Sequence, residues 1–374
     1  MAQHIPMRVF LLTGLLLAGT QISGAQTRQF DAGRTLGVRE DLSASLSMGD
    51  LDGDGDLDVV VANGRHWPAE NEVFFNDGTG RFLHAIPLSQ DRTTSYAVPM
   101  ADLDGDGDLD VVEGNDNVRN LPYLNDGTGR FLPQPPLGPP ANTRSITLAD
   151  LNGDGHPDVL VTNRGQTNTI HLNDGSGGFP TSTPFGSDDD STIDVVAVDV
   201  NGDAHVDLVL ANRDGQENRV YLNDGLGRFE VSNPFGTGSD ETRGVGVGDM
   251  NGDGHLDIVT ANIGQENGVY FGDGTGSFTS GIHYGPADAE SYSVALADLD
   301  KDGDLDIVVA NVGSQNAAYF NTGDGKSFEK VLFGGAENDS YGLAVGDVDG
   351  DGYPDIGIAN SGAPNYIYRN GIQR

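Results

Sequence analysis

One nine-residue acidic phrase, repeated at a nearly constant interval, constrains the fold of this 374-residue chain more than any other feature. It follows the pattern D-x-[DN]-x-D-[GA]-x-x-D and occurs seven times, with starts 48 to 52 residues apart. The starts are Asp50, Asp102, Asp150, Asp199, Asp249, Asp298 and Asp347. Self-similarity at this period is typical of repeat architectures rather than of two or three unrelated domains.

Each repeat predicts four short strands. A short alternating segment such as residues 45–48 enters the acidic loop, and a β-branched run such as residues 58–63 follows it. A third segment carries an aromatic residue (220–223), and a turn rich in Asp-Gly (125–131) leads to the fourth. No part of the chain after its first residues shows sustained helical periodicity. Four strands per repeat of about 49 residues are typical of a propeller blade.

The two ends of the chain complement each other. A Phe lies 19 or 20 residues before each later acidic loop, and Phe30 holds this place before Asp50 without a preceding third strand. Residues 366–371 supply a third strand and half a turn, after which the chain has no fourth strand. The sequence therefore predicts an all-β, seven-bladed β-propeller closed by pairing of the N- and C-terminal strands. The alternative is an open solenoid with free ends.

The acidic loops predict a bound hard cation. They hold 28 of the 57 acidic residues, and crowded carboxylates do not all stay ionised at neutral pH without a cation. Oxygen ligands at positions 1, 3, 5 and 9, with the carbonyl of position 7, suit Ca²⁺ better than Mg²⁺ or Zn²⁺. The alternative is a set of solvated Asp-Gly turns without an ion.

We therefore expect up to seven calcium ions, one per blade. The predicted ligands are Asp50, Asp52, Asp54, Asp56 and Asp58; Asp102, Asp104, Asp106, Asp108 and Asp110; Asp150, Asn152, Asp154, His156 and Asp158; Asp199, Asn201, Asp203, His205 and Asp207; Asp249, Asn251, Asp253, His255 and Asp257; Asp298, Asp300, Asp302, Asp304 and Asp306; and Asp347, Asp349, Asp351, Tyr353 and Asp355. The position-7 residues (Asp56, Asp108, His156, His205, His255, Asp304 and Tyr353) would bind through their backbone carbonyls.

The seven sites are not expected to be equal. Asn at position 3 removes one charge from the third, fourth and fifth loops, and Ala204 stands in the fourth loop where a Gly with positive φ is expected. The fourth site is therefore predicted to be the weakest. An EF-hand is excluded because a β-branched run, rather than a bidentate Glu and a helix, follows each loop; Glu113 at a twelfth position is a coincidence.

These residues resemble those of the FG-GAP/VCBS repeat proteins, whose blades are similar to the integrin α-subunit propeller. The resemblance rests on the seven Asp loops, the N-D-G-x-G-x-F turns and four Phe-Gly or Tyr-Gly steps at 185–186, 235–236, 284–285 and 333–334, and it covers about residues 27–374. It implies calcium in the blade loops and frequent roles in adhesion or glycan contact. It implies no single activity, because the fold hosts lectin-like and lyase-like proteins.

Composition and the N-terminus bound the location and the partners. A formal net charge of −37 disfavours nucleic acid and anionic lipid as partners. Arg8, an apolar run over residues 9–18 and small residues at 23–25 predict a signal peptide over residues 1–25, with residues 26–374 as the propeller. The alternative is an uncleaved anchor. We expect a secreted, periplasmic or cell-surface protein, with no membrane span after cleavage, acting as a monomer.

No catalytic constellation is evident in the sequence. His156, His205 and His255 each occupy position 7 on a different blade, so they are interpreted as repeat variation. In the longest repeat, Trp67 could stack on a sugar whose hydroxyls Arg65 and His66 bond, or it could pack on a neighbouring blade. The Gln and Asn of the G-Q-x-N turns are interpreted as turn caps.

The leading hypothesis is a non-enzymatic, calcium-binding adhesion or interaction module for a glycan or an extracellular protein. The alternatives are a polysaccharide lyase or hydrolase, and a purely structural scaffold.

Overall fold

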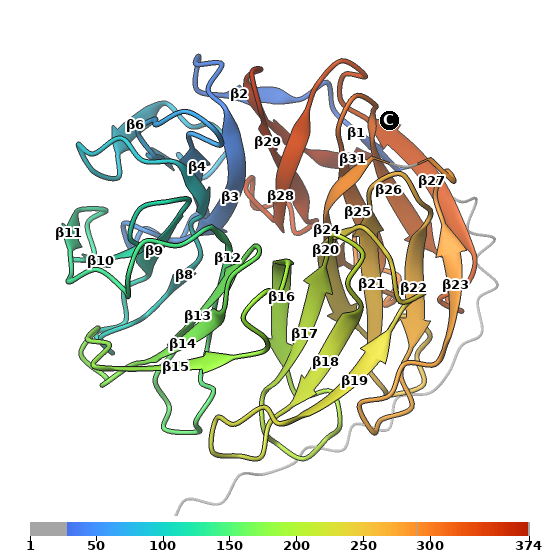
Figure 1. The fold of residues 1–374 in the computed structure, drawn as a ribbon. Coiled ribbons are helices and arrows are strands. Elements are labelled where there is room, and N and C mark those ends of the chain that lie inside the picture. Colours follow the sequence, from blue (N-terminus) through green and yellow to red (C-terminus); the bar gives the residue numbers. More distant parts are fainter. Residues whose placement is uncertain (1–27, 289, 373–374) are drawn as a thin grey trace, which may run out of the picture.

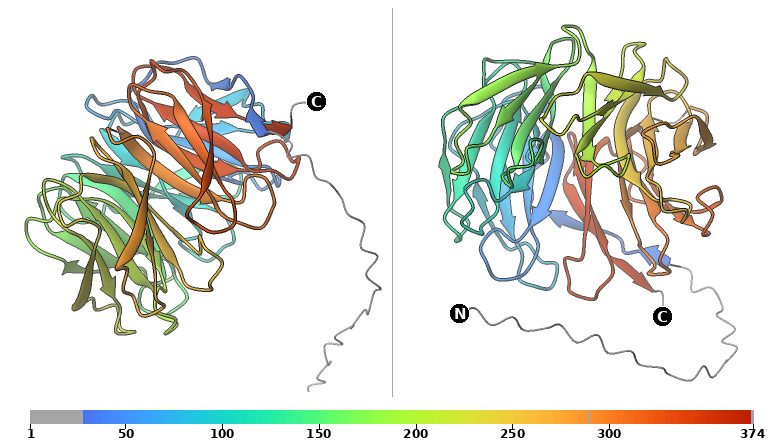
Figure 2. Two further views of the ribbon diagram at one scale, coloured as in Figure 1. Left: turned by 90° about the vertical axis from the view of Figure 1, so that its right-hand side faces the viewer. Right: turned by 90° about the horizontal axis from the view of Figure 1, so that it is seen from below.

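The computed structural model describes residues 28–288 and 290–372, and its regular elements are all strands (Figure 1). Seven sheets of four strand positions surround a central channel, and the strands within each sheet are antiparallel. The two side views show these sheets from the rim of the ring (Figure 2). The described residues contain no helix that could span a membrane. The predicted seven-bladed propeller is confirmed.

The four strand positions recur from blade to blade. The innermost strands are β3 (Ser43–Gly49), β7 (Ser95–Ala97) with β8 (Met100–Ala101), β12 (Thr143–Ala149), β16 (Thr192–Val198), β20 (Thr242–Gly248), β24 (Ser291–Ala297) and β28 (Ser340–Gly346). The second strands are β4 (Asp58–Asn63), β9 (Asp110–Asn115), β13 (Asp158–Asn163), β17 (Asp207–Asn212), β21 (Asp257–Asn262), β25 (Asp306–Asn311) and β29 (Asp355–Asn360).

The two outer positions complete each blade. The third strands are β5 (Glu72–Phe75), β10 (Leu121–Asn125), β14 (Asn168–Leu172), β18 (Asn218–Leu222), β22 (Asn267–Phe271), β26 (Asn316–Asn321) and β30 (Asn365–Tyr368). The outermost strands are β6 (His84–Pro87), β11 (Phe131–Pro133), β15 (Thr181–Phe185), β19 (Val231–Phe235), β23 (Ser280–Tyr284), β27 (Phe328–Phe333) and β2 (Arg34–Leu36).

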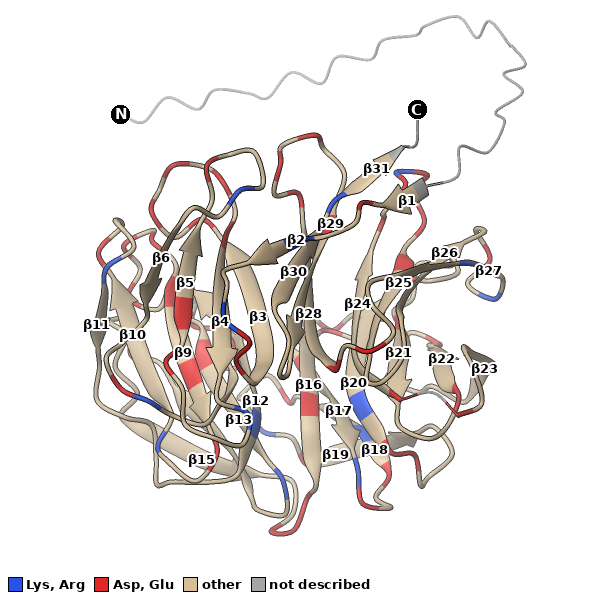
Figure 3. Ribbon diagram, turned by 90° about the horizontal axis from the view of Figure 1, so that it is seen from above, with Lys and Arg blue, Asp and Glu red and all other residues tan. Residues whose placement is uncertain are grey.

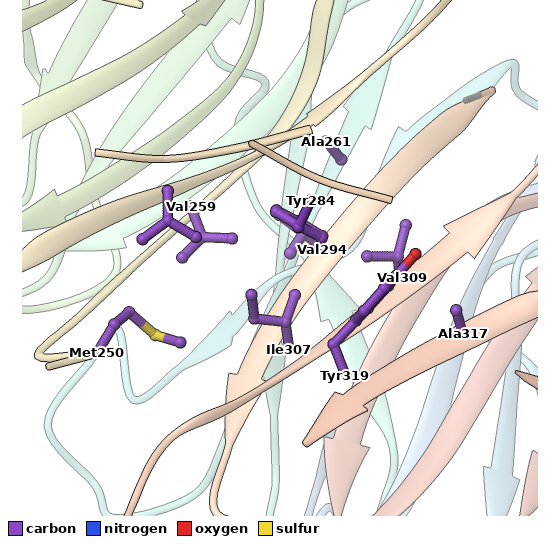
Figure 4. Close-up of a cluster of buried hydrophobic side chains, with 10 residues drawn as sticks. Met250, Val259, Ala261, Tyr284, Val294, Ile307, Val309, Ala317 and Tyr319 are labelled. Atoms are coloured by element: carbon purple, nitrogen blue, oxygen red, sulfur yellow. The ribbon is translucent and has the colours of Figure 1, made fainter. Parts of the chain in front are cut away.

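The second strands are buried on both faces, because a neighbouring blade covers each side. Val59, Val60 and Val61 in β4 are all 0% exposed. An uninterrupted β-branched run, rather than an alternating one, is the pattern that such a strand requires. The core therefore lies between blades. One such layer joins β21 and β22 of the fifth blade to β25 and β26 of the sixth, with Val259, Val269, Ile307 and Tyr319 in contact (Figure 4).

The N-terminus closes the ring, as predicted. β2 pairs with β30 as the outermost strand of the last blade, and Thr35 lies opposite Tyr366. A second contact, not foreseen, is a two-stranded ribbon of β1 (Arg28–Phe30) and β31 (Asn370–Ile372). The Asp31 carboxylate accepts a hydrogen bond from Arg369 Nε at 3.0 Å. The open-solenoid alternative is therefore wrong. The predicted signal peptide lies outside the described residues.

Every innermost strand begins with the same irregularity. In β3, Ser43 pairs with Asn63 and Ser45 pairs with Ala62, so that Ala44 is an extra, bulged residue. The same register shift occurs at the start of the innermost strand in all seven blades. A bulge re-aims the side chain of the extra residue. The residues at this position line the mouth of the channel, described below.

Candidate metal centre

Each acidic loop joins an innermost strand to a second strand, and acidic residues (red in Figure 3) gather in these loops. In the first loop, the two oxygens of the Asp50 carboxylate accept backbone N–H groups from Gly53 at 2.8 Å and Gly55 at 3.0 Å. Asp54 accepts the N–H of Asp56 at 3.0 Å. These bonds bend the loop back on itself.

The position-9 aspartate fastens the loop to its blade. Asp58 is 0% exposed, and its two oxygens accept N–H groups from Leu51 and Asn76, each at 2.9 Å. The equivalent aspartates of the other six loops are also 0% exposed and accept the corresponding pairs of N–H groups. A carboxylate oxygen has a second lone pair, so these bonds leave it able to contact a cation. Sequence reasoning missed this bridging role.

Four of the loops bring three carboxylates together. One oxygen from each member of a group lies within 4.8 Å of the others. The groups are Asp50, Asp52 and Asp58; Asp102, Asp104 and Asp110; Asp298, Asp300 and Asp302; and Asp347, Asp349 and Asp351. They belong to the first, second, sixth and seventh loops, which are the loops with Asp at position 3. Position 9 contributes in the first two, and position 5 in the last two.

Buried carboxylate oxygens without a hydrogen-bond donor favour the binding of a cation at these loops. Oδ1 of Asp52 is buried and has no hydrogen-bond partner among the described residues. The same holds for Oδ1 of Asp347 and Oδ1 of Asp349 in the seventh loop. A buried unpartnered carboxylate oxygen is costly unless an ion or water reaches it. The all-oxygen donor set fits a hard divalent cation such as Ca²⁺.

The pKa values of the loop aspartates also indicate that their ionised forms are unfavourable without a cation. Burial, and then the charge of Asp54, raises the pKa of the Asp52 carboxyl. Burial raises the pKa of Asp58 and of Asp110 to about 6, and that of Asp306 and of Asp355 to about 7, with nearby loop aspartates adding to the shift. A divalent ion would lower these values, because it favours the ionised form.

The three loops with Asn at position 3 resolve the conflict internally. Asn152 accepts the N–H of Asp154 at 2.9 Å through Oδ1 and donates its Nδ2–H to the Asp154 carboxylate at 2.9 Å. The fourth loop repeats both bonds through Asn201. The Asn side chain therefore bonds the position-5 carboxylate, which in the loops with Asp at position 3 (the all-Asp loops) has no such donor and is available to a cation. This agrees with the lower charge predicted for the loops with Asn at position 3.

The loop backbone requires positive φ at two positions. Ala204, at position 6, has φ of 69°, as predicted, while the other loops place Gly there. Position 4 also has positive φ, and Lys301 occupies it with φ of 61°. This second requirement was missed, although Gly stands at position 4 in the other six copies and was a usable signal. The fourth loop is therefore not the only strained one.

The position-7 side chains lie on separate blades. Each of the three histidines packs against a positive-φ Gly in the Asp-Gly turn of its own blade: His156 against Gly175, His205 against Gly225 and His255 against Gly274. A Cβ on any of these glycines would lie 2.5–2.6 Å from the imidazole ring. The structure does not bring the three histidines into one site, in agreement with their interpretation as repeat variation.

An asparagine clamp links neighbouring loops, and sequence reasoning missed it. The Asn that opens the Asp-Gly turn of one blade donates Nδ2–H to the position-2 carbonyl of the preceding loop, for example Asn125 to Leu51 at 2.8 Å. Asn370 and Asn76 continue this pattern, and Asn76 donates across the closure to Val348 at 2.8 Å. In the fifth blade Gly272 replaces the Asn. The fourth loop therefore lacks a clamp.

The residues proposed as a ligand rim lie at the other end of the blades. Arg65 stacks on Tyr341 with 3.4 Å between its guanidinium carbon and the ring centroid, and His66 Nδ1 lies 3.4 Å from the Tyr96 hydroxyl. Trp67 is 73% exposed, so the expectation that it packs on a neighbouring blade is wrong. The glutamines of the G-Q-x-N turns cap the start of the innermost strand in their own blade, as Gln216 does by accepting the N–H of Ser191 at 2.7 Å.

Comparison with known proteins decides the family. A model of the FG-GAP-like repeat matches six overlapping segments that together span residues 50–358. The chain belongs to the FG-GAP-like repeat family. Among solved structures, this FG-GAP-like propeller resembles BBS1N in complex with ARL6DN in two crystals, soaked with mercury and with lead. The TM-scores are 0.62 and 0.61, at 13% identity, over 91% and 92% of this chain and 97% of the other. That likeness shows the fold alone. No curated protein matches the chain.

Proposed function

We propose that this protein is a secreted, calcium-loaded propeller that acts as a non-enzymatic interaction module for an extracellular glycan or protein. One observation carries the calcium part: in four loops three carboxylate oxygens lie within 4.8 Å of one another, and buried oxygens of Asp52, Asp347 and Asp349 have no donor. Positions 1, 3, 5 and 9 and the position-7 carbonyl would hold the ion. Bound Ca²⁺ would supply the positive charge that keeps these carboxylates ionised.

The magnitude of the repulsion supports this proposal. Two unit charges 4.8 Å apart repel by about 1 kcal/mol in bulk water and by about 3.5 kcal/mol at an effective dielectric constant of about 20. Three such pairs in each of four loops, all ionised, would oppose folding by about 10 kcal/mol even at the dielectric constant of water, which is already the size of a whole domain's stability of about 5–15 kcal/mol. A divalent ion in each loop converts this repulsion into attraction and adds its binding free energy to folding.

An interaction role is supported by the regularity of the ring. The repeats differ in length by only four residues, which leaves little room for the long loops that enclose enzyme pockets. BBS1N, a chain of the same fold, is in complex with a protein, ARL6DN. The secreted location rests on the signal-peptide pattern of residues 1–25.

Two measurements test this function. Calorimetric titration of the chelated protein with Ca²⁺ is expected to show several sites, with those of the four all-Asp loops filling before the fourth loop. Screening of the calcium-loaded protein against glycans and extracellular proteins is expected to give binding without change in polymer length. Depolymerisation of a bound polysaccharide would instead support the lyase or hydrolase alternative. A calcium titration that shows no binding heat would contradict the proposed metal sites.

A further inference from the structure

The bulged residue at the start of each innermost strand lies at one end of the central channel. The seven residues at this position are Ala44, Tyr96, Arg144, Ile193, Arg243, Tyr292 and Tyr341. All of them line one cavity of about 200 Å³. We call this ring and its cavity the channel mouth. Cavities for drug-sized ligands are larger, about 300–1,000 Å³, so the mouth admits one ligand group rather than a long segment.

Arginine and tyrosine side chains form stacked pairs around the channel mouth. The guanidinium carbon of Arg144 lies 4.5 Å from the centroid of Tyr96, and that of Arg243 lies 4.6 Å from the centroid of Tyr292. Arg65 stacks on Tyr341 at 3.4 Å, and Tyr292 and Tyr341 meet edge to face at 4.7 Å. Stacking fixes the planes of the guanidinium groups, which lowers the entropy that a ligand must remove.

The charge of the channel mouth opposes that of the rest of the protein. Arg65, Arg144 and Arg243 converge there in a chain of net charge −37. Asp116 pairs with Arg144 at 3.0 Å. The other acid, Asp194, lies on the neighbouring strand β16 and accepts hydrogen bonds from Ser145 Oγ and from the N–H groups of two valines, so the wall satisfies its oxygens.

Arg243 carries a hydrogen-bond donor that the wall of the mouth does not satisfy. Its Nε is buried and has no hydrogen-bond partner among the described residues. Burial, followed by the charges of Arg213 and Arg65, lowers its pKa to about 10, which still leaves it charged at neutral pH. Arg213 itself pairs with Glu241 at 3.1 Å. The blue segment of β20 in Figure 3 marks the strand that presents Arg243.

His66 adds a donor or acceptor rather than a charge. Burial and then Arg65 and Arg144 lower the pKa of its imidazole, so it is neutral at pH 7. It belongs to the long loop of the first blade, which carries Arg65 over the mouth and leaves Trp67 exposed beside it. This loop therefore places a cation on Tyr341 and a polar ring on Tyr96 at the mouth, and its next residue, Trp67, is 73% exposed.

The acidic loops do not cancel the field of the mouth. Asp249 lies six positions after Arg243 along β20 and its end, which is about 20 Å at roughly 3.3 Å per residue. The Debye length at physiological ionic strength is about 8 Å, so the mouth lies more than two screening lengths from the loops. The acids that act on an anion at the mouth are therefore Asp116 and Asp194, against three arginines, rather than those of the acidic loops.

We propose that the channel mouth binds a carboxylate-bearing sugar residue of an acidic glycan, with its carboxylate on Arg243 and Arg65 and its ring against Trp67. This deepens the proposed interaction function and rests on it. Guanidinium groups recognise planar carboxylates with two parallel hydrogen bonds. An aromatic face that is open to solvent suits the apolar face of a sugar ring. An acidic peptide offers no such face to Trp67.

The test uses the full calcium-loaded protein and trigalacturonic acid as the probe, with its methyl ester and the peptide Glu-Glu-Glu as comparisons. Isothermal titration at fixed Ca²⁺ compares wild type with Arg243→Gln, Arg65→Gln and Trp67→Ala. The control is Arg130→Gln, which removes the same charge from an exposed turn outside the mouth. Arg65 and Trp67 lie on a surface loop, so these two variants report binding even if Arg243→Gln lowers stability.

We expect the trimer to bind the wild type and Arg130→Gln alike, and each arginine variant to weaken binding by about tenfold or more, as for loss of a charged hydrogen bond. The methyl ester, which lacks the carboxylate charge, should bind the wild type no more tightly than the trimer binds the arginine variants. No binding of the trimer, or equal binding by all variants, overturns the proposal; tighter binding of Glu-Glu-Glu overturns the glycan assignment in favour of an acidic peptide. If calcium stabilises the protein while the trimer fails, only this inference falls.

Discussion

Replacement of Ala204 by Gly should stabilise the folded protein, because it removes backbone strain from the fourth acidic loop. Ala204 has φ of 69°. An L-residue in this region costs about 1–2 kcal/mol relative to the right-handed region. Gly avoids that cost but loses more conformational freedom on folding, by about 0.5–1 kcal/mol. The expected net gain is about 0.5–1 kcal/mol in the free energy of unfolding.

The fifth acidic loop allows the reverse substitution at the same position. Gly254 occupies the same position in the fifth loop with φ of 87°, and a Cβ built there meets nothing within 4 Å. Gly254→Ala therefore tests the backbone alone, without a steric clash. It should destabilise the protein by about the same 0.5–1 kcal/mol that Ala204→Gly gains.

Urea unfolding at saturating calcium, followed by circular dichroism, measures both variants. Ala204→Gly should raise the urea midpoint and Gly254→Ala should lower it, with the slope unchanged. A lower midpoint for Ala204→Gly, or no change for Gly254→Ala, would refute the assignment of strain to position 6.

Three further predictions concern closure, the clamp and pH. Leu36→Ala in the closing strand should cost about 2–4 kcal/mol in urea unfolding, because Leu36 is 2% exposed in the core, whereas Val38→Ala, at a 94% exposed site, should change little. Asn321→Ala, which removes a 2.8 Å bond to the preceding loop, should speed hydrogen exchange in that loop and cost about 1–3 kcal/mol; unchanged exchange would contradict the clamp. Burial raises the pKa of Asp306 and Asp355 to about 7, above their unfolded values, so in the metal-free protein their stabilising contribution is present at low pH and lost as pH rises through 7. Calcium affinity should have the opposite pH dependence and decrease as the pH is lowered below about 7, because protons compete with the ion. Binding at pH 7 should therefore release protons. Calcium titrations that do not depend on pH would contradict this prediction.

The repeat made the ring predictable, because the features that build it recur in every copy. Seven acidic loops fixed the number of blades, and the unmatched Phe30 and residues 366–371 located the closure. The strain at Ala204 was predictable for the same reason, since one copy departs from the others. Lys301 departs in the same way at position 4 and was overlooked.

The channel mouth was not predictable, because its residues are the ones that vary between copies. Tyr96, Arg243 and Ile193 occupy one structural position without any shared chemistry in the sequence. The stacking of Arg65 on Tyr341 joins the first blade to the last, which only ring closure brings together. The exposure of Trp67 also depends on where its loop lies over the ring.

The proposed function depends on divalent ions bound among the clustered aspartates of the blade loops. Its most direct test is the thermal midpoint of the purified protein before and after exhaustive chelation, paired with elemental analysis of the metal that is removed. We expect several calcium ions per chain and a large drop in the thermal midpoint that added Ca²⁺ reverses. An unchanged midpoint together with no bound metal would contradict it.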